Sequence, residues 1–145
     1  FLLAKPLYYL SALFYMLFHR QNYHMRFKLN CQTVDHKYMM ISVGNSSGYG
    51  LTPSAVPYNG WLDVSAIRMP KFFGVLEGLL MLAHRRILNY GLVTPFRTSE
   101  IYIESLDGAP IAIDGRPFKP KLPMLVTVEH ECLNLVIPSK LNRKR

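Results

Sequence analysis

The clearest pattern along the chain is a strict alternation of apolar and polar residues between positions 23 and 30. Successive side chains of a β-strand point to opposite faces of the sheet, so this period of two is typical of a strand with one face in the core. We therefore predict a half-buried strand over 23–30. The apolar face of this strand carries Tyr23, Met25, Phe27 and Leu29, and the polar face carries His24, Arg26, Lys28 and Asn30.

A continuous apolar run, rather than an alternating one, covers residues 37–43 and ends at the turn-rich stretch 44–50. Such a run predicts a strand that is buried on both faces. A loop is expected to follow as far as Tyr58. The pair Asn59-Gly60 is a turn signal, and it precedes another predicted strand over 61–69.

Two segments have the pattern of helices. Residues 6–18 have Pro6 at a permitted first-turn position and apolar side chains on nearly every face, which predicts a helix covered on several sides. Pro70 opens a second, amphipathic helix whose last turn carries His84, so that this imidazole is expected to cap the helix and not to bind a metal. The apolar stripe expected to face the core comprises Phe72, Leu76, Leu79, Leu80, Ala83 and Ile87.

From Thr98 onward the chain consists of short apolar segments separated by Asp-Gly, Pro and Lys. Strands are predicted near 99–106, 110–114, 124–130 and 132–138, and strands at this spacing indicate an antiparallel sandwich or barrel. The fold class is therefore mainly β, an antiparallel β-sandwich with two α-helices. All 145 residues are expected to form a single domain. Because the first residue is not Met and lies inside an apolar pattern, we expect the chain to be a fragment of a longer protein.

Composition narrows the classes of partner. The net charge of +8, with basic residues at 143–145, favours an anionic partner such as a phosphate-bearing lipid, a nucleotide or a nucleic acid, although a solvated basic surface would give the same count. The aromatic residues mostly occupy apolar stripes, which argues against nucleic acid. Cys31 and Cys132 are too few and too distant for a zinc cluster, and free thiols fit a reducing cytoplasm. The apolar opening is interrupted at Lys5-Pro6 and is too short to cross a bilayer.

Three separated stretches carry a resemblance to a known family. They read MMISVGNSSGYGLTPSAVPYNGWLDV at 39–64, RTSEIYIES at 97–105 and IAIDG at 111–115. Their content and order resemble the C-terminal domain of the diacylglycerol kinase family, which includes bacterial lipid kinases and sphingosine kinases. The resemblance covers nearly the whole chain. It implies the C-terminal domain of the NAD kinase and diacylglycerol kinase-like fold, in a protein that transfers the γ-phosphate of ATP to a lipid hydroxyl.

The resemblance also implies a metal position. The family's loop runs Pro-x-Ala-x-x-x-Asp-Gly-x-Leu-Asp, and residues 53–63 follow it except that Asn59 replaces the first Asp. In the family a largely structural divalent ion lies near this turn. The neutral amide of Asn59 should weaken a site for a hard cation, and the alternative is that Asn59-Gly60 is simply a good hairpin turn.

A second family signature, Asp-Gly-Glu after a strand, appears as Asp114-Gly115-Arg116. In the family this Asp takes the proton from the lipid hydroxyl, a task that suits a carboxylate near neutral pH. The alternative is that Asp114 is only a turn residue, as Asp107-Gly108 seven residues upstream is expected to be. Arg116 reverses the charge of the family's Glu. It either pairs with Asp114 and weakens it as a base, or binds a phosphate oxygen.

The loop after the buried strand supplies the remaining candidates. Asn45 and Gly48 match positions that face the family's interdomain cleft, although Asn45 could simply satisfy backbone groups and Gly48 could mark an unusual backbone angle. The family's Gly-Gly-Asp-Gly phosphate loop belongs to an N-terminal nucleotide-binding domain that these residues lack. ATP and Mg²⁺ are therefore expected in the intact protein, and the chain alone should not turn over.

The expected partners are that missing N-terminal domain, a lipid substrate and an anionic membrane surface. The predicted location is the bacterial cytoplasm, peripheral to the inner face of the membrane. Exposed strand edges could also pair two copies into a homodimer. Two rival functions stay open, a catalytically silent lipid-binding or regulatory domain, which Asn59 and Arg116 favour, and a closer kinship to NAD kinases.

Overall fold

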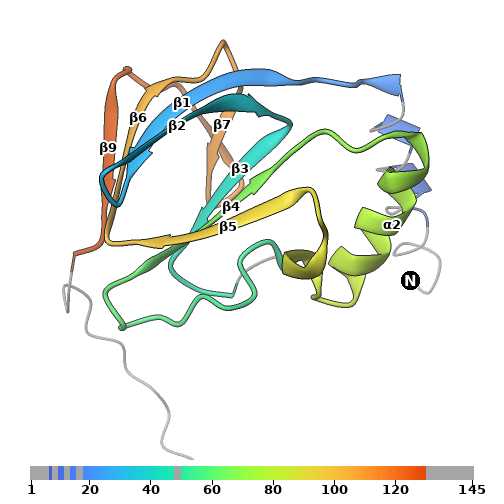
Figure 1. Cartoon of the computed structure of the whole chain (residues 1–145), viewed down its shortest axis with the longest axis horizontal. Helices are drawn as coiled ribbons and strands as arrows, with labels where there is room; N and C mark the ends of the chain where they lie inside the picture. Colours follow the sequence, from blue (N-terminus) through green and yellow to red (C-terminus); the bar gives the residue numbers. More distant parts are fainter. Residues whose placement is uncertain (1–6, 8–9, 12–13, 16–17, 48–49, 130–145) are drawn as a thin grey trace, which may run out of the picture.

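Two antiparallel sheets face each other across a hydrophobic core (Figure 1). The computed structural model describes residues 7, 10–11, 14–15, 18–47 and 50–129. The first sheet has the strand order β2-β1-β6-β9 and the second the order β3-β4-β5, and a two-stranded β7-β8 hairpin is added to them. The strands are β1 Tyr23–Leu29, β2 Gln32–Tyr38, β3 Met40–Gly44, β4 Leu62–Ile67, β5 Val93–Thr98, β6 Glu100–Ser105, β7 Ile111–Ile113, β8 Arg116–Phe118 and β9 Met124–Thr127.

The alternating segment near the N-terminus is the strand that its pattern predicts. In β1 the side chains of Met25, Phe27 and Leu29 are buried, and the residues between them are exposed. A two-residue turn at Asn30 and Cys31, both at positive φ, returns the chain into β2. Such a turn matches the twist of the paired strands.

The predicted strand over 37–43 is wrong as a single element. The chain leaves the first sheet at Tyr38, the end of β2, and enters the second sheet at Met40, the start of β3. The apolar run therefore spans a crossing from one sheet to the other, and β3 is only half-buried. The described residues between β3 and β4 form no strand, as the predicted loop requires. The strand predicted within 61–69 is confirmed as β4.

The core lies between the inner faces of the two sheets. Phe27 of β1 and Ile101 of β6 are fully buried, and they pack in one cluster with Val64 and Ala66 of β4. The ring of Phe27 also meets that of Phe96 in β5 edge to face, with centroids 6.3 Å apart. Fully burying a side chain of this size contributes about 1.5–3 kcal/mol. The mainly β, antiparallel fold class is confirmed.

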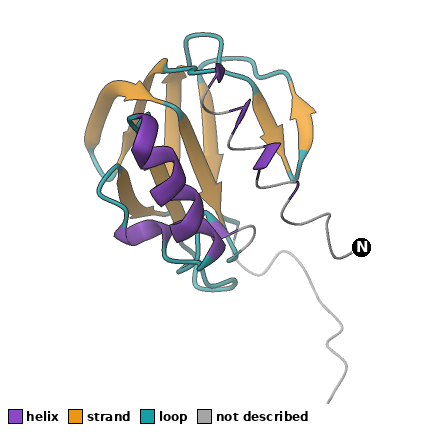
Figure 2. Ribbon diagram, turned by 90° about the vertical axis from the view of Figure 1, so that its right-hand side faces the viewer, coloured by secondary structure: helices purple, strands orange, loops and turns teal. Residues whose placement is uncertain are grey.

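The second predicted helix is present as α2, Phe72–Ala83, and the 3₁₀ helix η2, Ile87–Asn89, follows it (Figures 1 and 2). The Nδ1 of His84 donates to the carbonyl of Leu80 at 2.8 Å, so the capping role predicted for this imidazole is confirmed. Helix α2 and η2 cover a second cluster of buried residues that includes Ile87 and Tyr90.

The predicted core-facing stripe is wrong for most of its members, since only Ile87, which lies in η2, is buried and Leu79 is half-buried. Phe72, Leu76 and Leu80 are each more than half exposed. The helix instead turns its Gly74 and Gly78 toward the ring of Tyr90, where an added Cβ would lie 2.7 Å and 3.2 Å from ring or hydroxyl atoms. The Tyr90 hydroxyl donates to the Gly74 carbonyl at 2.7 Å. The two glycines leave room for the Tyr90 ring against the helix, so the face of α2 that carries them packs on Tyr90. A pattern of apolar residues alone does not reveal this.

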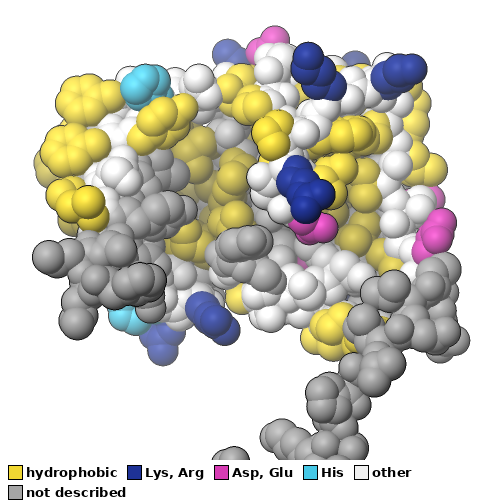
Figure 3. Space-filling view, turned by 180° about the vertical axis from the view of Figure 1, so that it is seen from behind, with side chains coloured by type: hydrophobic (Ala, Val, Ile, Leu, Met, Phe, Trp, Pro, Cys, Tyr) yellow, Lys and Arg dark blue, Asp and Glu magenta, His cyan; other side chains and the backbone are white. Residues whose placement is uncertain are grey.

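The segment predicted as the first helix lies partly outside the described residues. Those that are described between positions 7 and 18 are helical, but their large apolar side chains are exposed, so the predicted cover on several sides is absent from the described structure. Hydrophobic side chains gather on the surface at the end of the molecule that holds this segment and α2 (Figure 3). Within the described part of the chain, no helix is long and apolar enough to span a membrane.

Several remaining predictions concern the C-terminal half. β6, β7 and β9 fall within predicted strands, whereas β5 and β8, each of which contains a proline, had not been expected. The predicted strand at 132–138, Cys132 and the basic residues 143–145 lie outside the described residues. Cys31 is a free, exposed thiol.

Candidate functional site

The loop over residues 45–61 is anchored to the second sheet by buried hydroxyl groups. The Thr52 hydroxyl donates to the Ser46 carbonyl at 3.1 Å, and the Ser65 hydroxyl of β4 donates to the Leu51 carbonyl at 2.7 Å. Thr52 and Ser65 are almost fully buried. Gly44, the last residue of β3, passes so close to Thr52 that an added Cβ would lie 2.3 Å from its hydroxyl oxygen. The loop therefore begins at a position that only glycine can occupy.

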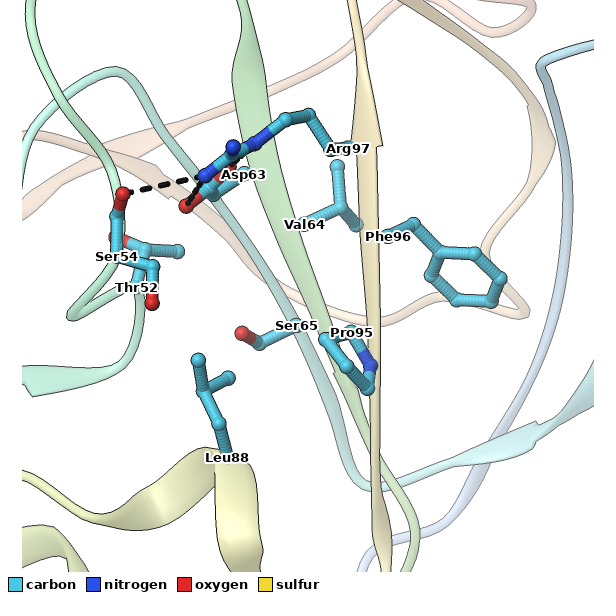
Figure 4. Close-up of a pocket in the computed structure, with 9 residues that line it drawn as sticks. All are labelled: Thr52, Ser54, Asp63, Val64, Ser65, Leu88, Pro95, Phe96 and Arg97. Carbon is cyan, nitrogen blue, oxygen red and sulfur yellow. Dashed lines mark hydrogen bonds and ion pairs between the residues drawn. The ribbon is translucent and has the colours of Figure 1, made fainter.

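A hollow of about 310 Å³ lies between this loop and strands β4 and β5 (Figure 4). Its polar groups are already engaged, because the two buried hydroxyls bond to loop carbonyls and the charged groups bond to each other. A specific binding site needs polar groups that are free to orient its ligand, and few such donors or acceptors remain in this hollow. The hollow is lined by Thr52, Ser54, Asp63, Val64, Ser65, Leu88, Pro95, Phe96 and Arg97.

An ion pair between Asp63 and Arg97 closes one side of the hollow. The two residues stand directly opposite each other in β4 and β5. The Arg97 Nε donates to one Asp63 carboxylate oxygen at 2.7 Å, and a terminal nitrogen donates to the other at 3.2 Å and to the Ser54 carbonyl at 3.3 Å. Asp63 is only 9% exposed. The hydrogen bond that Arg97 donates to this carboxylate, and then the negative charge of the carboxylate, raise the pKa of the Arg97 guanidinium above its ordinary value.

The metal position implied at Asn59 can be tested against this geometry. The Asn59 side-chain oxygen accepts a hydrogen bond from the Trp61 backbone N–H at 2.9 Å, which closes a local turn. Both oxygens of the nearest carboxylate in the motif, Asp63, hold Arg97. Among the described residues no three His, Cys, Asp or Glu side chains gather as metal ligands. Protein sites for Mg²⁺ and Ca²⁺ are built around carboxylates, with carbonyls and waters completing the shell, and Asp63, the only carboxylate of this motif, already holds Arg97, so the residues present do not fit such a cation.

Asp114 occupies the tip of the β7-β8 hairpin. Asp114 and Gly115 have φ values of 48° and 76°, so both lie in the left-handed region that a two-residue hairpin turn demands. Asp107 and Gly108 have nearly the same values, 49° and 74°. The backbone alone therefore does not distinguish the two Asp-Gly pairs. Their side chains differ, because Asp107 accepts a long hydrogen bond from the His24 N–H at 3.4 Å, whereas no side-chain hydrogen bond or ion pair of the described residues involves Asp114.

The other predicted site residues are placed as follows. Arg116 is exposed, lies opposite Ile113 in the hairpin and forms no ion pair with Asp114. Asn45 is exposed and directly follows β3. Gly48 lies outside the described residues. No hydrogen bond or ion pair among the described residues connects Asn45 with Asp114, so the cleft role of both stays a prediction.

Sequence reasoning missed the importance of Asp63 and Arg97. Asp63 was visible as the last residue of the loop motif, but no role followed from that position. Arg97 lies 34 residues further along the chain. Only the pairing of β4 with β5 brings the two together, and β5 was itself not predicted. A charged residue in each of two facing strands would have been a signal if their register had been known.

Two antiparallel sheets around one core, with the loop over 45–61 anchored to β4, define a β-sandwich domain. Residues 1–137 match the family model described as the YegS C-terminal NAD kinase beta sandwich-like domain. The chain belongs to this family. The resemblance to the C-terminal domain of diacylglycerol kinase-like proteins is thereby confirmed.

One solved structure has a similar fold. A Bacillus anthracis str. Sterne protein described as a diacylglycerol kinase superposes with a TM-score of 0.55 at 13% identity, over 79% of this chain and 37% of that one. Two further B. anthracis structures with similar descriptions give TM-scores of 0.49 and 0.46 at 12% and 15% identity, over 79% and 66% of this chain and 36% of each of theirs. This chain thus spans little more than a third of the length of those proteins. No curated protein matches it significantly.

Proposed function

We propose that this domain forms the acceptor side of an ATP-dependent lipid kinase and that Asp114 is its general base. Family membership supports the kinase class, and 37% coverage of a matched chain supports a nucleotide-binding domain elsewhere in the parent. The observation that carries the residue assignment is the state of Asp114. Its carboxylate is exposed on a two-residue turn with no partner among the described residues, so no ion pair or hydrogen bond of this chain competes with a substrate proton for it.

The proposed reaction is an in-line phosphoryl transfer. The lipid hydroxyl loses its proton to the Asp114 carboxylate as its oxygen bonds to the γ-phosphorus of ATP, and the bond to the β-phosphate oxygen breaks to release ADP. Mg²⁺ bound with ATP would neutralise the phosphate charge. In this chain Gly115 holds the turn, and the exposed guanidinium of Arg116 is placed two residues from the base, where it could bind a phosphate oxygen.

The test compares two matched substitutions in the intact parent. Asp114→Asn should lower kcat for phosphorylation of diacylglycerol by about 10²–10⁴-fold, the usual contribution of a general base. Asp107→Asn changes the same residue type in a turn of the same backbone conformation, and it should leave kcat within about twofold. Equal losses in the two variants, or full activity of Asp114→Asn, would contradict the assignment. Assays with NAD as acceptor distinguish the NAD kinase alternative.

A catalytically silent lipid-binding domain is the second candidate. Arg116, which replaces the family's Glu, favours it, because a positive charge beside the base position is the opposite of the expected one. A parent that binds lipid vesicles but phosphorylates neither diacylglycerol nor NAD would support this function. The double variant Asn59→Asp with Arg116→Glu would then be expected to stay inactive as well.

A further inference from the structure

We infer that the guanidinium of Arg97, acting beside the buried hydroxyls of Thr52 and Ser65, takes the place of a divalent cation in fixing the 45–61 loop to the sandwich, so that this domain folds without a structural metal. The inference goes beyond the proposed kinase function, because it concerns how the loop is held and not how phosphate is transferred. It starts from a disagreement: the resemblance implies a metal near Asn59, and the residues present do not fit one.

The contacts of Arg97 are those that a bridging cation would make. The guanidinium donates hydrogen bonds to three oxygens, the two of the Asp63 carboxylate and the Ser54 carbonyl. Asp63 belongs to β4 and Ser54 to the loop, while Arg97 itself belongs to β5. The single side chain therefore connects two strands and the loop. The planar fork of an arginine suits a carboxylate held by two parallel hydrogen bonds.

Charge balance also favours the arginine over a metal. Asp63 is buried, and a buried carboxylate needs a compensating cation. Arg97 supplies one positive charge for this one negative charge. A divalent ion placed on the same carboxylate would face the guanidinium at short range, and the neutral amide of Asn59 would add no negative charge to balance it. The Asp63 carboxylate can therefore hold either the Arg97 guanidinium or a divalent ion, but not both.

The loop contains its own reporter for a test. Trp61 is the only tryptophan of the chain and directly follows the Asn59-Gly60 turn. In the 145-residue chain, neither 10 mM Mg²⁺ or Ca²⁺ nor EDTA should change the Trp61 emission or move the melting temperature by more than about 1 °C. Arg97→Gln should shift the Trp61 emission and lower the melting temperature by about 5 °C, because it leaves Asp63 buried without a cation.

Arg116→Gln is the matched control, because it removes an arginine that forms no ion pair among the described residues. Its melting temperature and Trp61 emission should equal those of the wild type. If Arg97→Gln fails to fold, Arg97→Lys takes its place, because lysine keeps the positive charge but cannot donate two parallel hydrogen bonds to the carboxylate. The Arg97→Lys chain should fold, with a melting temperature below that of the wild type. A wild-type chain that is stabilised by Mg²⁺ or Ca²⁺ with a change at Trp61 would overturn the inference, and so would an Arg97→Gln chain indistinguishable from Arg116→Gln. Neither result would affect the kinase assay of Asp114.

Discussion

The molecule contains two aspartate and arginine combinations that differ in almost every respect. Asp63 and Arg97 are 34 residues apart in the sequence, yet they face each other across β4 and β5 and form a two-pronged ion pair. Asp114 and Arg116 are two residues apart, yet they form no pair, because Asp114 lies in the turn at positive φ while Arg116 begins β8. Closeness in sequence is therefore a poor guide to which charges meet.

The two aspartates differ in whether their carboxylates are already paired, and only an unpaired carboxylate is available to react with a substrate. Asp63 is 9% exposed, and both oxygens of its carboxylate accept hydrogen bonds from Arg97, so this carboxylate is fully occupied by a structural ion pair. The carboxylate of Asp114 is exposed and has no partner in the described part of the chain. A group that must accept a proton from a substrate cannot also be neutralised by a permanent ion pair. This contrast supports Asp114, and not Asp63, as the proposed base.

The largest effect on stability is expected when the buried acid is changed. Asp63→Asn should lower the free energy of unfolding by about 2 kcal/mol, because it removes a charge-assisted bond at a buried site and leaves Arg97 with one acceptor fewer. Asp114→Asn should change it by less than about 0.5 kcal/mol, since the side chain is exposed. Urea unfolding of both variants measures the difference.

This comparison fails if the two variants are equally stable. It is sharpened by Arg97→Gln in the Asp63→Asn background. Because the two side chains contact each other, the second substitution should then cost much less than it does alone. Additive losses would mean that the pair contributes nothing beyond its separate residues.

A smaller effect is expected at the turn that carries the available acid. Gly115 has a φ of 76°, and an added Cβ would meet no other atom within 4 Å, so Gly115→Ala adds backbone strain without a clash. The expected cost is about 1 kcal/mol. The parent kinase should also lose activity, because the strain displaces Asp114.

Gly91→Ala is the control for this turn. Gly91 has equally open space around it but no positive φ, so the substitution should be neutral or slightly stabilising. If Gly115→Ala were as stable as Gly91→Ala and the parent stayed fully active, the rigid placement of Asp114 by its turn would be contradicted.

The sequence predicted the secondary structure best where one local rule decided it. The alternation around Phe27 fixed β1, and the Asp-Gly pairs marked both turns. The rules failed where tertiary packing decided. The apolar run 37–43 crosses between sheets, and no local pattern marks the crossing at Met39. In α2 the glycine face packs on Tyr90 together with Met81 and Leu82, while Phe72, Leu76 and Leu80 are exposed.

The candidate site shows the same division. Asp114 could be singled out because a family motif surrounds it, but whether it faces a substrate stays a prediction, since the domain expected to complete the cleft is not part of this chain. The Asp63 and Arg97 pair could not be found beforehand. Its existence depends on the register of two strands, and β5, interrupted by Pro95, has a weak strand pattern.

The smallest predicted effect concerns an acid between these two extremes. Glu104 of β6 is paired, with Lys28 at 2.5 Å and Arg26 at 3.0 Å, but its side chain is 24% exposed, against 13% for the side chain of Asp63. The hydrogen bond from Lys28, with the charges of Lys28 and Arg26, holds the pKa of the Glu104 carboxyl below its ordinary value of 4.5, against partial burial and the charge of Asp35. A lowered pKa in the folded state means that the ionised carboxylate favours folding above about pH 4.5 and that this contribution is lost as the pH falls through the lowered pKa.

Glu104→Gln should therefore reduce the loss of melting temperature between pH 5 and pH 3 by less than about 2 °C, because solvent screens a pair of this exposure. Lys28→Gln should act in the same direction, since it removes the largest cause of the shift. Both differences should shrink in 1 M NaCl. The comparison fails if Glu104→Gln changes the stability as much as Asp63→Asn does, or if its effect is the same in 1 M NaCl. Burial would then not distinguish the Asp63–Arg97 ion pair from the pairs of Glu104.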